Sequence, residues 1–199
     1  MPLRPLRLAS KRKAVVSLAA VAAVLLAGGL WAGLRGGGTP SGQSYVDGNP
    51  DAVIYAAGHR AALPEFSGTT LAGARLTSAT YRGQVLVLNF WGSWCSPCRS
   101  EGPTLAALST RYQHAGVSFL GVDTQDTPTN AEAFEQGFGI KYPSLNDPGN
   151  SVAQVIGGAV PVSATPTTLV IDRTDHVAGA IFGTATYSVL NDMLSKVAA

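Results

Sequence analysis

The chain is predicted to fold as an α/β domain with a central sheet, placed behind an N-terminal transmembrane helix. Two observations carry this prediction. From about residue 63 to the end, short apolar runs typical of buried strands alternate with segments of helical periodicity. Near the start, residues 14–34 form an almost uninterrupted apolar stretch. Apolar residues make up 46% of the 199 residues and charged residues 13%, a composition that favours a folded core over disorder.

The first 34 residues have the pattern of a membrane anchor. Ser17 is the only polar side chain in residues 14–34, and at about 1.5 Å per residue such a helix spans roughly 31 Å, close to the thickness of a bilayer's hydrocarbon core. Five basic residues and no acidic residue precede it, so the positive-inside rule places residues 1–13 in the cytoplasm as a basic tail. A cleaved signal peptide is the alternative. Its apolar region usually has about 7–15 residues, so we expect a retained single-pass anchor in the plasma membrane with the C-terminal domain outside.

Residues 35–62 are expected to form a flexible linker, and residues 63–199 the folded domain. The segment 35–52 is rich in Gly, Pro, Ser and Asp and has no apolar periodicity. From residue 36 onward, eight Lys or Arg stand against twelve Asp or Glu, a net charge of −4. This acidic balance argues against a nucleic-acid partner.

The first predicted strand, residues 85–90, leads directly to the two cysteines of the chain. It is a near-continuous apolar run, as expected of a strand buried on both faces. A helix should follow the cysteines and end at Gly116. Its buried face would carry Leu105, Leu108 and Tyr112.

The remaining predicted elements alternate in the same way. Residues 117–123 form a second buried strand, and residues 129–132 have a capping-box pattern that opens a helix with Phe134 and Phe138 on one side. The later elements are a turn at 147–150, strands at 167–172 and 177–182 around Thr174 and Asp175, and a last helix with apolar side chains at 189, 190, 193, 194 and 197.

Cys95 and Cys98 are the only cysteines, and two residues separate them. This spacing, after a strand and at the start of a helix, is a strong signal for a dithiol redox site. The partial positive charge of the helix N-terminus stabilises a thiolate, which is the species that attacks disulfides. Cys95, at the N-terminus of the helix, is therefore the expected nucleophile. Cys98, one turn further along the helix, is the expected resolving thiol. Pro97 lacks an N–H and fits the first helical turn.

Two other kinds of cysteine pair fit the sequence less well. A zinc site needs four ligands, and His59, His114 and His176 are scattered without ligand spacing. An inert structural disulfide would close only a tiny loop, where the loss of chain entropy stabilises least. Both are less favoured than a redox site.

Two motifs resemble the TlpA/ResA-like branch of the thioredoxin superfamily. They are residues 89–103 (NFWGSWCSPCRSEGP) and residues 164–168 (ATPTT), and the resemblance covers roughly residues 63–199. It implies a thioredoxin-like fold, in which helices flank a central mixed sheet. It also implies an exported or membrane-anchored thiol–disulfide oxidoreductase, often one that reduces partners during cytochrome c maturation. Such an enzyme has protein thiols and disulfides as substrates, an upstream electron donor in the membrane, and no cofactor besides its own cysteine pair.

The resemblance also assigns residues. Trp94, Cys95, Pro97 and Cys98 match the redox motif. Thr165 and Pro166 match a pair whose proline is cis and whose preceding backbone pairs with the substrate chain. Pro103 matches a proline that kinks the helix, and residues 126–150 resemble the family's central insert.

Glu101 is the candidate proton carrier. It follows Cys98 by three residues and so lies on the same helical face as that thiol. It matches an active-site glutamate of the resembling family. Asn89 stands where cytosolic-type thioredoxins carry an acid, and asparagine takes no proton at neutral pH. The alternative is a solvated glutamate favoured by the helix dipole.

Two other functions occur on the same fold. A peroxiredoxin-like peroxidase shares the fold but attacks peroxide from one cysteine in a different local motif. A copper-binding thioredoxin-fold protein typically spaces its cysteines by three residues and adds a histidine. Neither pattern fits the Trp-Cys-Ser-Pro-Cys segment.

Overall fold

The computed structural model describes residues 42–46 and 48–199. The predicted anchor at 14–34 and the basic tail lie outside these residues. Within them, no helix combines the length and the hydrophobicity needed to cross a membrane.

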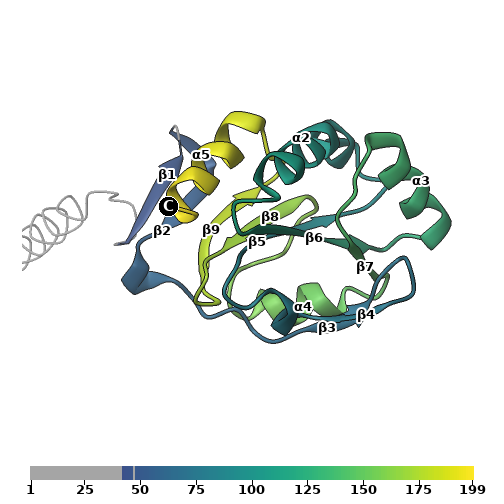
Figure 1. Ribbon diagram of the computed structural model, residues 1–199, viewed down its shortest axis with the longest axis horizontal. Coiled ribbons are helices and arrows are strands. Elements are labelled where there is room, and N and C mark those ends of the chain that lie inside the picture. Colours follow the sequence, from purple (N-terminus) through teal and green to yellow (C-terminus); the bar gives the residue numbers. More distant parts are fainter. Residues whose placement is uncertain (1–41, 47) are drawn as a thin grey trace, which may run out of the picture. The chain divides into compact units, whose positions relative to one another are not determined.

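A seven-stranded mixed sheet forms the centre of the domain (Figure 1). Its strand order is β1-β2-β9-β8-β5-β6-β7. The pairs β5–β6 and β6–β7 are parallel, and the other neighbours are antiparallel. The strands are β1 (Gln43–Val46), β2 (Asn49–Tyr55), β5 (Val85–Trp91), β6 (Val117–Thr124), β7 (Ser144–Asp147), β8 (Thr167–Ile171) and β9 (Val177–Phe182). The mixed sheet of the predicted fold is thus confirmed.

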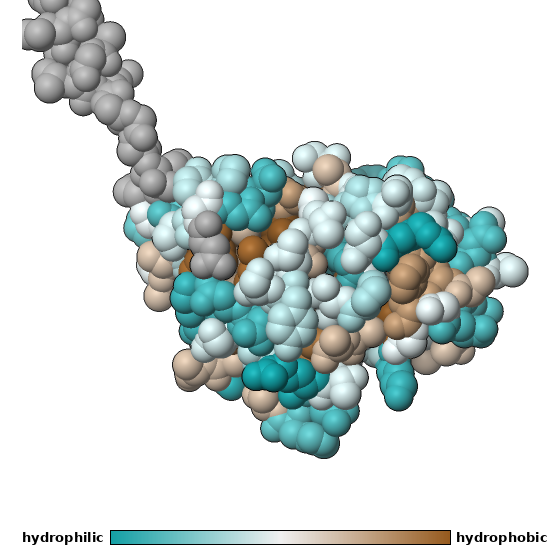
Figure 2. All heavy atoms as spheres, turned by 90° about the horizontal axis from the view of Figure 1, so that it is seen from above, coloured by the Kyte–Doolittle hydropathy of each residue, from teal (hydrophilic) through white to brown (hydrophobic). Residues whose placement is uncertain are grey.

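Helices cover both faces of this sheet. On one face lie α2 (Ser96–Tyr112), α3 (Pro128–Phe138) and α5 (Tyr187–Val197) (Figure 1). On the other lie α4 (Ser151–Gly157) and the hairpin of β3 (Ser67–Thr69) and β4 (Arg75–Thr77). Short 3-10 turns complete the chain at Ala57–His59 and Ser78–Tyr81. Figure 2 shows the face covered by α2, α3 and α5, where hydrophilic side chains dominate and apolar ones are visible between them.

Strand β5 explains why the sheet is buried on both faces. All seven of its residues are buried, and successive side chains point to opposite sides. Val85 and Val87 join the core beneath α2 and α5, whereas Leu86, Leu88 and Phe90 join the core on the α4 side. Full burial of one such side chain stabilises the fold by about 1.5–3 kcal/mol. The strand therefore gives the loop after it a rigid base.

The linker predicted for residues 35–62 is wrong from residue 43 onward. Strand β1 pairs with β2, and β2 pairs with β9 in the register Val53↔Ala180. Ala52 is 0% exposed, so this polar-looking segment contributes to the core. The compact unit accordingly begins at Gly42. The prediction failed because β2 is held in the sheet by hydrogen bonds to β9, far away in the sequence, and β1 in turn pairs with β2.

The capping pattern predicted at 129–132 is displaced by two residues. Thr127 is the N-cap of α3, and its hydroxyl accepts a hydrogen bond from the Asn130 N–H at 3.4 Å. Pro128 follows as the first helical residue, where its missing N–H costs nothing. The predicted turn at 147–150 is confirmed, but helix α4 directly after it and strand β7 before it were not predicted.

Candidate active site

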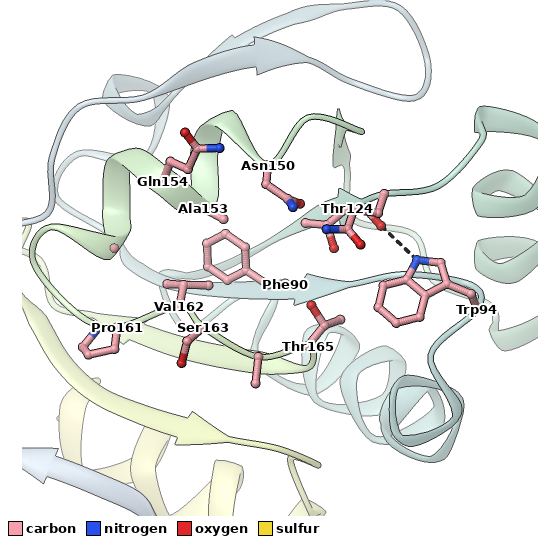
Figure 3. A pocket seen from close by; sticks show the side chains of 13 residues that line it. Phe90, Trp94, Thr124, Asn150, Ala153, Gln154, Pro161, Val162, Ser163 and Thr165 are labelled. Atoms are coloured by element: carbon pink, nitrogen blue, oxygen red, sulfur yellow. Dashed lines mark hydrogen bonds between the residues drawn. The ribbon is translucent and has the colours of Figure 1, made fainter.

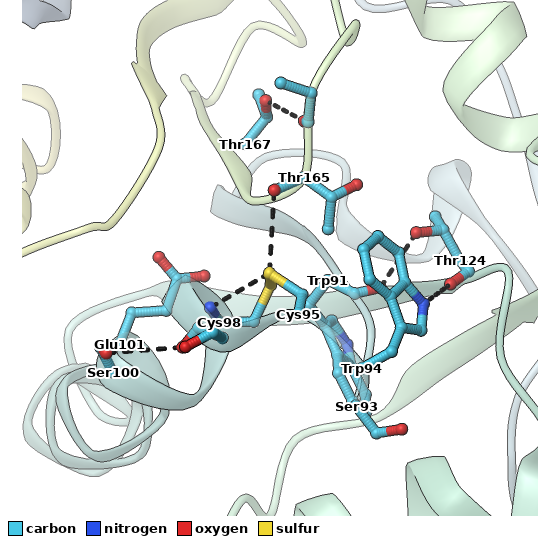
Figure 4. The surroundings of a disulfide bond; sticks show 12 residues. Trp91, Ser93, Trp94, Cys95, Cys98, Ser100, Glu101, Thr124, Thr165 and Thr167 are labelled. Atoms are coloured by element: carbon cyan, nitrogen blue, oxygen red, sulfur yellow. Dashed lines mark hydrogen bonds between the residues drawn. A yellow bond between two sulfur atoms is a disulfide. The ribbon is translucent and has the colours of Figure 1, made fainter.

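The two cysteines form a disulfide where strand β5 gives way to helix α2 (Figure 4). Their sulfur atoms are 2.13 Å apart, and their Cα atoms 5.3 Å. Cys95 is the N-cap of α2, and its Sγ accepts a hydrogen bond from the Cys98 N–H at 3.2 Å. This N–H belongs to the first turn of the helix and has no carbonyl partner within it, so it can donate to a Cys95 thiolate.

Both cysteines are buried. Cys95 is 3% exposed and Cys98 1%, so the expected contrast between an exposed and an inner thiol is small in the disulfide form. What distinguishes Cys95 is its neighbour across the site, because its Sγ lies 3.7 Å from the Thr165 carbonyl oxygen. Thr165 precedes Pro166, and the peptide bond between them is cis, as the resemblance implied.

An uncharged groove of about 600 Å³ opens beside the disulfide (Figure 3). Trp94 and Thr165 line its end nearest the cysteines, and helix α4 lines its far side. Apolar atoms come from Phe90, Ala153 and Val162, and amides or hydroxyls from Gln125, Asn150, Gln154 and Ser163. Of the residues that the structure describes, no Asp, Glu, Lys or Arg lines this groove. It therefore suits an extended, neutral segment of a partner chain.

The redox loop, Trp91–Trp94, is held by the end of β6 and the segment that follows it. The Trp94 indole N–H donates to the Thr124 carbonyl at 3.1 Å, and the Thr124 hydroxyl donates to the Trp91 carbonyl at 3.1 Å. Asp126 accepts a hydrogen bond from the Ser93 N–H at 2.6 Å. Trp94 itself is 55% exposed, unusual for so large an apolar side chain. Pro97 is exposed in the first turn of α2, as predicted.

Glu101 is buried in α2, one turn beyond Cys98 (Figure 4). It is 1% exposed, so the interpretation as a solvated glutamate is wrong. Its carboxylate accepts hydrogen bonds from the Asn89 side-chain amide and the Ala185 N–H, both at 2.8 Å. Burial raises the pKa of Glu101 to about 7, although these two hydrogen bonds lower it. The carboxyl group therefore exchanges a proton near neutral pH.

Sequence reasoning missed several residues of this site. Thr124 and Asp126 hold the redox loop, and Thr168 accepts a hydrogen bond from Asn89 at 3.0 Å. The sequence did contain a signal for Thr124 and Asp126. They end or follow a strand parallel to β5, and the carboxyl ends of parallel strands meet at one edge of a sheet. Among the residues with described positions, no group of three or more His, Cys, Asp or Glu side chains is arranged to hold a metal ion.

Comparisons with known proteins bear on this geometry. A model of the AhpC/TSA family matches residues 59–180. The chain is 34% identical over 134 residues to the thiol-disulfide oxidoreductase ResA of Geobacillus thermodenitrificans, covering 67% of this chain and 75% of that protein. It is 28% identical over 134 residues to ResA of Bacillus subtilis, covering 67% of this chain and 73% of that protein.

Two solved structures are similar over nearly their whole length. One is a DsbF homologue from Corynebacterium diphtheriae, with a TM-score of 0.69, 32% identity, and coverage of 80% of this chain and 99% of that one. The other is a secreted thiol-disulfide isomerase from Corynebacterium glutamicum, with a TM-score of 0.69, 31% identity, and coverage of 79% and 99%.

Proposed function

Since the chain belongs to the AhpC/TSA family and to the ResA-like thiol–disulfide oxidoreductases of the thioredoxin superfamily, we propose that it reduces protein disulfides outside the cytoplasm. The enzyme class follows from the family. The direction of electron flow is our proposal. The observation that carries disulfide exchange is the Cys95–Cys98 pair at the start of α2, beside the Thr165 carbonyl and an uncharged groove. The reductive direction is proposed from the resemblance of residues 89–103 and 164–168 to the TlpA/ResA-like branch.

The proposed cycle begins with the dithiol form. The Cys95 thiolate attacks one sulfur of the partner disulfide, and the other partner sulfur leaves as a thiolate. Cys98 then loses its proton and attacks Cys95 Sγ, which releases the partner's second thiol. Two electrons have passed to the partner, and the Cys95–Cys98 disulfide has formed. An upstream dithiol donor in the membrane would return the pair to its reduced form, with no cofactor besides the two cysteines.

Glu101 is proposed to take the proton that Cys98 gives up. A general base works best when its pKa lies near the operating pH, and burial brings the pKa of Glu101 to about 7. Asn89 and the Ala185 N–H hold the carboxylate in one orientation. Trp94, Thr165 and Pro166 are proposed to bind the partner, with the backbone before Pro166 pairing with the segment around its cysteine.

The partner class is proposed to be apocytochrome c, oxidised at its haem-attachment cysteines. The names of the ResA relatives give their activity and no substrate, so support comes from the motif resemblance and the uncharged groove. A C-x-x-C-H segment is neutral or weakly charged, which suits a lining without acids or bases.

The direction of electron flow between the protein and its partner is tested by the reduction potential of the Cys95–Cys98 pair, measured by equilibration with glutathione. We expect a value near that of thioredoxin, about −270 mV, because a reductant must hold its disulfide form stably. A value near that of DsbA, about −120 mV, would make the protein an oxidant. A peptide with an oxidised C-x-x-C-H segment should be reduced by the dithiol protein, with the Cys95→Ser/Cys98→Ser variant as control. Peroxide consumption or tight copper binding without peptide reduction would favour the alternative functions.

Location is a second part of the proposal. Residues 14–34 are proposed to remain in the plasma membrane with the C-terminal domain on the outer side; one similar structure is of a protein described as secreted. Cell fractionation should find the full-length chain with membranes, and protease added to spheroplasts should digest its C-terminal domain. A variant lacking residues 1–34 should stay in the cytoplasm. A shortened, soluble product outside the cell would instead indicate a cleaved signal.

A further inference from the structure

Asp123 is a buried acid that the proposed cycle does not use. It lies on β6, in register with Trp91 on β5 and Asn146 on β7. The residue is 0% exposed, and no group of the described residues donates a hydrogen bond to either of its carboxyl oxygens. A buried, ionised carboxyl without donors is costly, whereas a neutral carboxylic acid costs much less.

The charged neighbours of Asp123 increase this cost. Asp126 lies in the loop after β6, Glu135 on α3 and Asp147 at the end of β7, and all three are acids. Burial, and then the charges of these residues, raise the pKa of Asp123 to about 7. Burial also raises the pKa of Glu135, and Glu132 adds to that shift. Trp91, which faces Asp123 from β5, does not titrate.

Two neighbours of this acid, Trp91 and Asp126, contact the redox loop. Trp91 packs in one buried cluster with Cys95 and Cys98, and stacks on Phe134 of α3 with ring centroids 4.5 Å apart. Asp126 accepts a hydrogen bond from the N–H of Ser93, two residues before Cys95, at 2.6 Å, and hydrogen bonds of this kind lower the pKa of Asp126. Asp123 therefore neighbours both Trp91, at the start of the loop, and Asp126, whose carboxylate binds the loop.

We propose that Asp123, beside Trp91 in the sheet and close to Asp126, is a positioning residue of the redox site, whose charge is coupled to that of the cysteine pair through the loop that carries Cys95. The proposal rests on the proposed function of the cysteine pair. Ionised, Asp123 would repel Asp126 and place a second negative charge behind the loop.

The proposal links reduction to a proton. When two glutathione thiols reduce the Cys95–Cys98 disulfide, they form glutathione disulfide and two electrons enter the pair. One of their two protons goes to Cys98, the other is released to solvent, and Cys95 becomes a thiolate. The new negative charge makes Asp123 hold its proton to a higher pH. Over the range in which Asp123 titrates, reduction therefore takes up an additional fraction of a proton there, and this contribution of Asp123 lowers the equilibrium constant for reduction as pH rises.

The test compares the wild type with Asp123→Asn, a neutral isostere, and with Asp51→Asn, the same change at an exposed carboxylate. The equilibrium constant for reduction of the Cys95–Cys98 disulfide by glutathione is measured from pH 5.5 to 8.5. The constant of Asp123→Asn divided by that of the wild type should stay near one below pH 6 and rise to about threefold by pH 8.5. This rise corresponds to a difference of about half a unit between the pKa values of Asp123 in the two redox states. Asp51→Asn should stay near one throughout. The ¹³C resonance of the Asp123 carboxyl should titrate at higher pH in reduced than in oxidised wild type.

Several results would overturn the proposal. A ratio that does not change with pH, or a carboxyl titration that is equal in both redox states, would separate Asp123 from the redox loop. Equal destabilisation of Asp123→Asn at every pH would make the residue merely structural. Stabilisation of the wild type alone by millimolar Ca²⁺ or Mg²⁺ would make Asp123 a cation ligand instead. None of these results bears on peptide reduction by the cysteine pair, so the proposed function is judged separately.

Discussion

Replacing Cys98 with serine is expected to trap the partner protein on Cys95 as a stable mixed disulfide. Cys95 can still attack the partner, because its Sγ keeps the Cys98-position N–H as a donor and the Thr165 carbonyl as a neighbour. Release of the partner needs attack by the second thiol, so turnover should fall on the order of 10³-fold or more. The measurement is non-reducing electrophoresis of acid-quenched cells, followed by mass spectrometry of the high-mass bands.

Cys95→Ser is the matched control for this experiment, because it makes the same sulfur-to-oxygen change in the same disulfide. It should trap little or no partner. Trapping by Cys95→Ser alone would exchange the roles of the two cysteines, a result of real interest because both are almost equally buried. If neither variant traps a protein, disulfide exchange with a protein partner is wrong. A trapped apocytochrome would support the proposed substrate class.

Glu101→Gln is expected to slow attack by Cys98 by about 10²-fold at pH 7, the lower end of what a general base contributes. Glutamine fills the same space and accepts a hydrogen bond from Asn89 or Ala185, but it takes no proton. Because the pKa of Glu101 is about 7, the wild-type rate should rise as pH increases through 7, and the variant should lose this rise. The rate is measured as release of a fluorescent peptide from its mixed disulfide with Cys95.

Stability gives Glu101 an independent test. The folded pKa of about 7 lies above the value of 4.5 expected in the unfolded chain, so the unfolded state releases its proton first as pH rises. Wild-type stability should therefore fall from about pH 4.5 to 7 relative to Glu101→Gln, and then change in parallel with it. Glu132→Gln on the exposed surface of α3 serves as control. Equal pH profiles of peptide release in variant and wild type would leave Glu101 only a structural role.

Much of the fold was predictable because its signals are local. The apolar run of β5, the CxxC segment with Pro97, and the periodicity of α5 each lie within one short stretch of chain. The cysteine pair was found for the same reason. Strands β1 and β2 were missed because β2 is stabilised by pairing with β9, far away in the sequence, and β1 pairs with β2.

The sequence alone determined that Cys95 and Cys98 form a redox pair at the start of a helix, since spacing and position are local properties. Only the tertiary structure decided the state of the acids around that pair. Glu101 has the sequence context of a surface residue, yet it is buried against Asn89 and Ala185 from other elements. Asp123 has the context of a turn residue, yet it lies in the sheet, and no described residue donates a hydrogen bond to its carboxyl group. A pKa depends on burial and on charges that packing brings close, and both belong to the assembled sheet and helices rather than to any one segment.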